Sequence, residues 1–137
     1  MRMMAKVHSR VYDGAEFAKW FMRQVSRELR CHDVDVASIG IFPGEVVIAF
    51  YCDGRRYLAR IKEGRKFRIS TYQFIYENGR FVKLEPFRMR KGESFLLTRR
   101  SGFTASVLFY VEDDVEIDVY EAQPPRGGSL LEPRDNY

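Results

Sequence analysis

Basic and aromatic side chains are interleaved between residues 55 and 91 of this 137-residue chain. Lys and Arg neutralise phosphates and aromatic rings stack on unpaired bases, so a mixed surface of this kind binds single strands without a sequence-specific motif. We therefore predict a low-specificity interface for single-stranded DNA or RNA. The expected phosphate contacts are Arg56, Arg60, Lys62, Lys66, Arg68 and Lys83, the expected stacking side chains are Tyr72, Phe74, Tyr76 and Phe81, and a following loop adds Arg88, Arg90 and Lys91.

The charges are divided along the chain, although the formal net charge is only +4. Residues 55–100 contain 14 basic and 4 acidic side chains, whereas residues 101–137 contain 2 basic and 8 acidic ones. Opposite charges on one chain favour contacts between copies. The alternative function is therefore a protein-interaction or assembly module, a homo-oligomer in which the basic middle of one subunit contacts the acidic segment 112–121 of another.

The acidic segment also raises the possibility of metal chemistry. Asp113, Asp114, Glu116 and Asp118 could gather a divalent cation for phosphodiester cleavage. However, apolar residues alternate with these carboxylates, which is typical of a solvated edge strand. No nucleophile is paired with either His8 or His32. We expect a protein that is not an enzyme and needs no cofactor or metal, and a divalent-metal nuclease is the third and least favoured function.

The two cysteines, Cys31 and Cys52, are too few for a secreted disulfide scaffold and lack the paired spacing of a zinc site. The sequence predicts two buried or helix-end thiols. A disulfide between them would be expected only in a protein from a hyperthermophile, where intracellular disulfides occur.

The periodicity of apolar residues indicates which elements position these side chains. Asp13-Gly14-Ala15-Glu16 has the form of a capping box, and the apolar period of 3.6 that follows predicts a helix over about residues 14–31. From residue 34 onward the period is two, with regular turn signals. This pattern predicts strands at 34–42, 45–52, 55–62, 65–77, 80–84, 94–100, 103–111 and 115–121.

The turn residues predict how these strands pair. Asp53-Gly54 and Asn78-Gly79 are strong signals for two-residue hairpins, and Pro43-Gly44 is expected to close another. A further hairpin is predicted at Gly64, where Lys62 would face Lys66 and Arg60 would face Arg68, although like charges opposite one another are destabilising. The expected registers pair Cys52 with Arg55, Val46 with Ile61, Ile39 with Ile48 and Ala37 with Phe50, and they leave Ala59, Ile61, Phe67, Ile69, Ile75 and Val82 on the face that the helix covers.

These elements predict an α+β domain over residues 1–122, in which one N-terminal helix packs on a bent antiparallel meander of seven to eight strands, with partial closure into a barrel as a variant. In a barrel or a two-sheet sandwich, Tyr72, Phe74, Tyr76 and Phe81 would lie inside the core rather than on a surface. The stretch 123–137 contains three Pro and two Gly without periodicity, and we expect a mobile tail.

The chain has no signal-peptide pattern and no apolar run long enough to span a membrane, so we expect an intracellular, cytoplasmic protein without a membrane partner. In overall character it resembles the small orphan proteins of hyperthermophilic archaea and their viruses, being short, rich in Arg, Glu, Tyr and Val, with a single Asn-Gly and few Gln. For a viral protein this resemblance implies the cytoplasm of an infected archaeal host.

Overall fold

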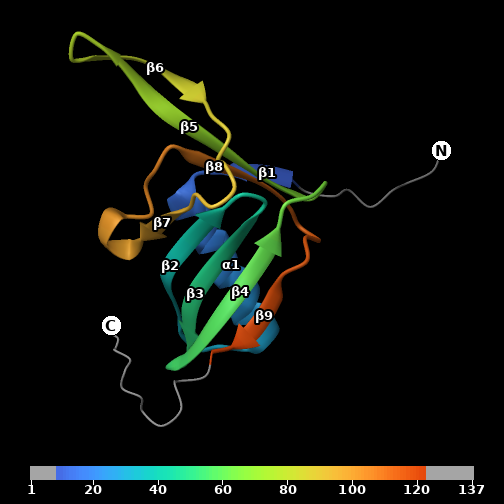
Figure 1. Ribbon diagram of the computed structural model, residues 1–137. Helices are drawn as coiled ribbons and strands as arrows, with labels where there is room; N and C mark the ends of the chain where they lie inside the picture. Colours follow the sequence, from blue (N-terminus) through green and yellow to red (C-terminus); the bar gives the residue numbers. More distant parts are fainter. Residues whose placement is uncertain (1–8, 123–137) are drawn as a thin grey trace, which may run out of the picture.

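The computed structural model describes residues 9–122 as one α-helix and nine strands in two antiparallel sheets (Figure 1). This arrangement confirms the predicted α+β class with antiparallel sheets, while the predicted tail at 123–137 lies outside the described residues. The elements in chain order are β1 (Ser9–Tyr12), α1 (Gly14–Leu29), β2 (Val34–Phe42), β3 (Glu45–Cys52), β4 (Arg55–Lys62), β5 (Phe67–Glu77), β6 (Arg80–Pro86), β7 (Phe95–Thr98), the short 3-10 helix η1 (Arg99–Ser101), β8 (Val107–Glu112) and β9 (Asp118–Glu121).

Helix α1 begins at the predicted capping box. The Asp13 carboxylate accepts a hydrogen bond from the Glu16 backbone N–H at 2.8 Å, and the Glu16 carboxylate accepts one from the Asp13 N–H at 2.9 Å. Two of the otherwise unpaired donors at the helix N-terminus are thereby satisfied. The apolar face buries Phe17, Phe21 and Val25, so the amphipathic pattern in the sequence is confirmed.

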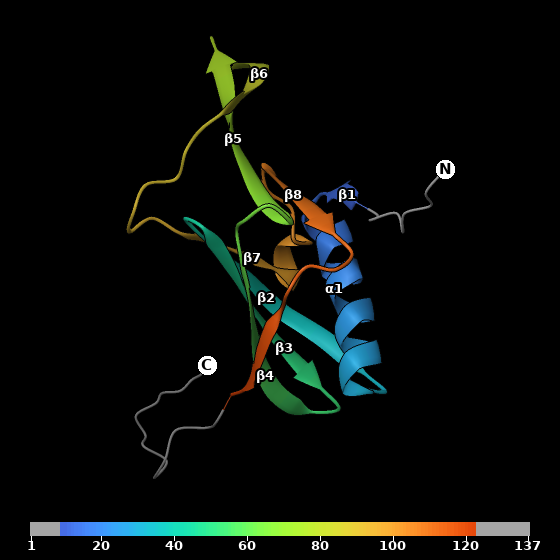
Figure 2. The same ribbon diagram turned by 90° about the vertical axis from the view of Figure 1, so that its right-hand side faces the viewer.

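The five-stranded sheet has the strand order β7-β2-β3-β4-β9. Its central hairpins have the predicted registers, with Cys52 opposite Arg55 and Ile39 opposite Ile48. One predicted pair is wrong, because a register shift between Val36 and Ser38 places Val36, rather than Ala37, opposite Phe50. Helix α1 covers one face of this sheet, and most of the other face is left open by the described residues (Figure 2).

The hairpin predicted at Gly64 does not form. Strand β9 pairs with β4 and places Asp118 opposite Arg60, while β5 leaves this sheet and pairs with β8 in the second sheet, β1-β8-β5-β6. The reason lies in burial, because Phe67 gains ring contacts with Phe17 and Phe109 in the second sheet. Only a single bridge between Gly64 and Phe67 remains of the expected turn. The predicted facing pairs Lys62/Lys66 and Arg60/Arg68 are therefore wrong.

Strand β5 belongs to the body of the molecule in its first half and to a projecting hairpin in its second. Residues 67–71 pair with β8, whereas residues 72–77 pair with β6. The β5–β6 hairpin extends well away from the body (Figures 1 and 2). Strand β1, which the sequence did not indicate, closes the far edge of this sheet against β8.

A β-bulge in β6 changes the faces of the hairpin. The Asn78-Gly79 turn pairs Glu77 with Arg80 as predicted, but the register then shifts, so that Lys83 rather than Val82 lies opposite Ile75. The extra residue at Val82 moves Lys83 to the side of Ile75, and Leu84 takes the place opposite Phe74. The predictions that Ile75 and Val82 face the helix are wrong, because both residues lie on the projecting hairpin outside the hydrophobic core, and 46% of Val82 is exposed.

Cys31 and Cys52 form a disulfide that joins the segment after α1 to the end of β3, with 5.5 Å between their Cα atoms. The prediction of two free thiols is therefore wrong. Sequence spacing carried no sign of the pairing, because it depends on the β2–β3 register, which places Val34 opposite Cys52 and so brings the end of the helix to that strand.

Candidate nucleic-acid interface

Four aromatic side chains lie on one face of the projecting hairpin, and we call them the aromatic strip: Tyr72, Phe74, Tyr76 and Phe81. Tyr72, Phe74 and Tyr76 are spaced by two along β5, and Phe81 lies opposite Tyr76 on β6. The Phe74 and Phe81 rings meet edge to face at 5.8 Å, and the Tyr76 and Phe81 rings at 6.1 Å. Phe74, Tyr76 and Phe81 are 54%, 60% and 53% exposed, so the hairpin part of the strip does not lie in a barrel or sandwich core.

The strip leads into a groove of about 700 Å³ at the base of the hairpin, which we call the aromatic groove. Its walls come from the β2–β3 turn, from β5 and from the loop after β6, and they include Phe42, Tyr72, Phe87 and Arg88. Tyr72 belongs to both features and therefore links the groove to the aromatic strip.

Two hydrogen bonds fix the loop wall of the aromatic groove to β5. The Thr71 hydroxyl donates to the Phe87 carbonyl at 2.6 Å, and the Phe87 N–H donates to the Thr71 carbonyl at 3.0 Å. These bonds order the backbone of the wall before a ligand binds, which lowers the ordering cost of binding.

Four predicted phosphate contacts are engaged inside the chain. Arg68 stacks over the Tyr110 ring with its guanidinium carbon 4.0 Å from the ring centre. The other three make ion pairs at 2.8, 2.8 and 3.8 Å, namely Arg60 with Glu45, Lys66 with Asp114 and Lys83 with Glu85. The hydrogen bond from Lys66 holds the pKa of Asp114 below its usual range. Each of these cations must give up an existing partner before it can bind a phosphate.

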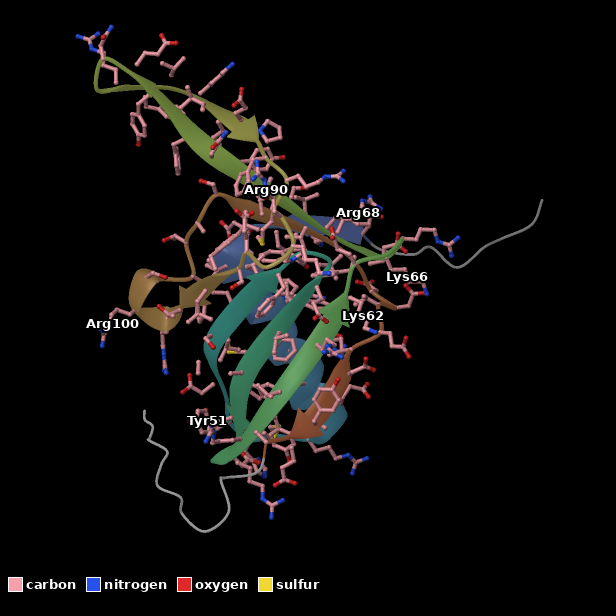
Figure 3. The ribbon with its side chains drawn as sticks, in the orientation of Figure 1. Tyr51, Lys62, Lys66, Arg68, Arg90 and Arg100 are labelled. Atoms are coloured by element: carbon pink, nitrogen blue, oxygen red, sulfur yellow. A yellow bond between two sulfur atoms is a disulfide. The ribbon has the colours of Figure 1, made fainter. Side chains whose placement is uncertain are left out.

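Within residues 9–122, the remaining five basic residues of the predicted set make no ion pair: Arg56, Lys62, Arg88, Arg90 and Lys91. Arg88 lines the aromatic groove, and Lys62 directly precedes Glu63, which also lines it. Arg90 lies at the base of the hairpin, whereas Lys62 lies at the end of β4, where it lines a second cavity with Lys66 and Glu116 (Figure 3). Arg56 lies at the opposite end of β4, across from Tyr51, and is separate from this group.

The acidic segment 112–121 contacts basic residues of its own chain. Beside the Lys66–Asp114 pair, Arg55 lies 3.5 Å from Glu121, and Arg60 lies opposite Asp118 in the sheet. This segment thus offsets positive charge along the edge of the body. Among residues 9–122 no three or more His, Cys, Asp or Glu side chains gather in a way that could hold a metal ion.

Two aromatic walls of the groove, Phe42 and Phe87, were missed as site residues. Phe42 was within reach of the sequence, because the predicted register buries Ile39 and Ile41 and so turns Phe42 to the opposite face, where it is 39% exposed. Phe87 offered no comparable signal, since its position depends on the bonds between Phe87 and Thr71.

No family model, curated protein or solved structure matches this chain. In the part of the chain that the structure describes, no helix combines the length and the apolar character needed to cross a membrane.

Proposed function

We propose that the protein binds single-stranded nucleic acid with low sequence specificity along the aromatic strip and the aromatic groove. The observation that carries the proposal is the coincidence of exposed rings with unpaired cations. Tyr72 belongs to both ring surfaces, Arg88 lines the groove, Arg90 and Lys91 follow Arg88 in the same loop, and Lys62 precedes Glu63 of the groove wall.

The ring spacing favours an extended strand over a duplex. The centres of the Phe74 and Tyr76 rings are 6.4 Å apart. This distance is about twice the 3.4 Å that separates successive nucleotides of a stacked strand. Bases can therefore use both rings only when they are unstacked from each other, as in single-stranded DNA or RNA. Each stacked base contributes on the order of 1 to 3 kcal/mol, whatever its identity.

The unpaired cations supply the salt-dependent part of the affinity. Each phosphate that is neutralised on a single strand lowers the slope of log K against log salt by about 0.7. If all four cations of the groove end bind phosphates, the slope is roughly −3. We therefore expect a binding constant that falls with salt at this slope, together with a stacking contribution that does not change with salt.

The test is titration of labelled oligo-dT and oligo-U with the full chain at two salt concentrations. Arg90→Ala is expected to weaken binding several-fold and to make the slope about 0.7 units less steep. The matched control is Arg100→Ala, because Arg100 lies on η1, away from the hairpin base (Figure 3). Phe74→Ala is expected to weaken binding at both salt concentrations with an unchanged slope. Equal losses from Arg90→Ala and Arg100→Ala, or preferred binding of a duplex, would contradict the proposal.

A further inference from the structure

One edge of the projecting hairpin has backbone groups without partners among residues 9–122. The Tyr72 N–H donates to the Ser106 carbonyl at 2.8 Å, toward β8, while the Thr71 carbonyl accepts from Phe87 on the opposite side. Because backbone groups alternate along a strand, Phe74 and Tyr76 direct their N–H and C=O groups to the β8 side as well. Strand β8 begins at Val107, opposite Thr71, so no described strand reaches Phe74 or Tyr76.

The two edges of the hairpin differ in their protection. The β6 edge contains the bulge at Val82, a lysine at Lys83 and Pro86, which are the features that prevent edge strands from pairing with other chains. Residues 73–77 on the β5 edge, QFIYE, contain no proline, lysine or bulge and are rich in strand-forming residues. An edge without these protective features is suited to adding another strand.

The hairpin also lacks the support that an isolated pair of strands needs. Two strands alone are marginally stable in water, whereas three or more with an apolar face are stable. Beyond Tyr72 the hairpin has only two strands, and Phe74, Tyr76 and Phe81 on it are more than half exposed. An added strand on the β5 edge would supply the missing support.

We propose that the occupant of this edge is a second copy of the chain, whose β5 pairs with β5 antiparallel about a two-fold axis at Ile75. In this register Phe74 lies opposite the partner's Tyr76, Ile75 lies opposite the partner's Ile75, and Gln73 lies opposite the partner's Glu77. Aromatic, aliphatic and amide–carboxylate pairs all stabilise neighbouring strands, and no like charges oppose each other. The edge is thus complementary to itself.

The backbone groups select the same register. Phe74 and the partner's Tyr76 would exchange two hydrogen bonds, and the two-fold axis repeats this exchange on the other side of Ile75. A shift that sets Phe74 opposite the partner's Phe74 would instead set Tyr76 opposite the partner's Tyr72, whose N–H is already bonded to Ser106. The proposed pairing joins two hairpins into a four-stranded sheet and leaves both aromatic strips on one face. It requires no nucleic acid and stands independently of the proposed function.

The first test is light scattering of the full chain over a wide concentration range without nucleic acid. We expect a monomer–dimer equilibrium that Ile75→Glu shifts toward monomer by at least about tenfold in Kd, because two carboxylates would meet at the axis. Within its own hairpin the new glutamate would lie opposite Lys83, so the hairpin itself is not weakened by repulsion. The matched control is Val82→Glu, which adds the same charge on the β6 edge and should leave the dimer intact.

The second test fixes the register. Ile75→Cys should give a disulfide-linked dimer under mild oxidation, because the axis brings two thiols opposite each other in a close, non-hydrogen-bonded pair. Val82→Cys should remain unlinked under the same conditions. The proposal is overturned if the wild-type chain stays monomeric at every concentration, if Val82→Glu dissociates the dimer as much as Ile75→Glu does, or if both cysteine variants cross-link equally.

Discussion

The two halves of β5 put the same residue type to opposite uses. Phe67, near the start of the strand, is 1% exposed and contacts the rings of Phe17 and Phe109, whereas Phe74, seven residues later, is 54% exposed. The body buries Phe17, Phe21, Phe50, Phe67 and Phe109 between α1 and its sheets, while Phe74, Tyr76 and Phe81 of the hairpin are more than half exposed. The buried aromatic residues of the body thus stabilise the fold, and those on the hairpin are available for contacts with other molecules.

The largest expected effect follows from exchanging these two phenylalanines for alanine. Phe67→Ala should lower the free energy of unfolding by about 3 to 5 kcal/mol, because it leaves a cavity among packed rings. Phe74→Ala should cost about 1 kcal/mol or less, since exposed positions away from the core rarely cost more. Trp20, the only tryptophan, stacks on Phe17 at 5.5 Å, so its fluorescence during urea unfolding reports the body. Similar losses for both variants would show that the hairpin is part of the core.

The second expected effect concerns the disulfide, which lies at the end of the body farthest from the hairpin. The bond closes a loop of sequence separation 21. In the chain-entropy model, a loop of about 20 residues gives roughly 3 kcal/mol of stabilisation. The Cys31→Ser/Cys52→Ser double variant should lose about this amount in urea unfolding followed by Trp20, and its nucleic-acid affinity should stay unchanged. A loss of binding in this variant would mean that the two regions are coupled.

Local patterns predicted those parts of the fold that depend on neighbours in the sequence. The capping box at Asp13 and Glu16 placed α1, and the two-residue turns at Asp53-Gly54 and Asn78-Gly79 placed the four strands of the β3–β4 and β5–β6 hairpins. The pattern at Gly64 was misleading, because the strand that pairs with β4 comes from residues 118–121, far along the chain. Alternation shows which face a residue takes and does not show which strand becomes its neighbour.

Most residues of the candidate site could be predicted from the sequence, but their arrangement in space could be predicted only in part. Tyr72, Phe74 and Tyr76 share a face because the period of two requires it. Lys83 was assigned to the same face, and the bulge at Val82 moved it to the other side. A single inserted residue inverts every following side chain, and nothing in the local sequence FVKLEP marks that insertion. The loss of Lys66 to Asp114 depends likewise on a distant segment, whereas Glu45, the partner of Arg60, lies on the neighbouring strand of the predicted β3–β4 hairpin.

The smallest expected effect is a pH dependence that belongs to the body alone. Asp53 accepts hydrogen bonds from the backbone N–H of Asp33 at 2.8 Å and of His32 at 3.0 Å, and these bonds hold the pKa of its carboxyl below the ordinary value of 3.8. A carboxyl whose pKa is lowered by folding stabilises the native state above its unfolded pKa, and this contribution is lost as the pH falls through the folded pKa.

Asp53→Asn should therefore be less stable than wild type near neutral pH, and the difference should shrink as the pH is lowered below 3.8. The Asn side chain can still accept one of the two N–H groups but cannot titrate, so the variant isolates the charged part of the interaction. Urea midpoints from Trp20 fluorescence at several pH values measure the difference. Since Asp53 is in the β3–β4 turn, beside the disulfide and away from the hairpin, dimerisation through Ile75 should be equal in both proteins at neutral pH. A difference in dimerisation would show that the β3–β4 turn and the hairpin are not independent.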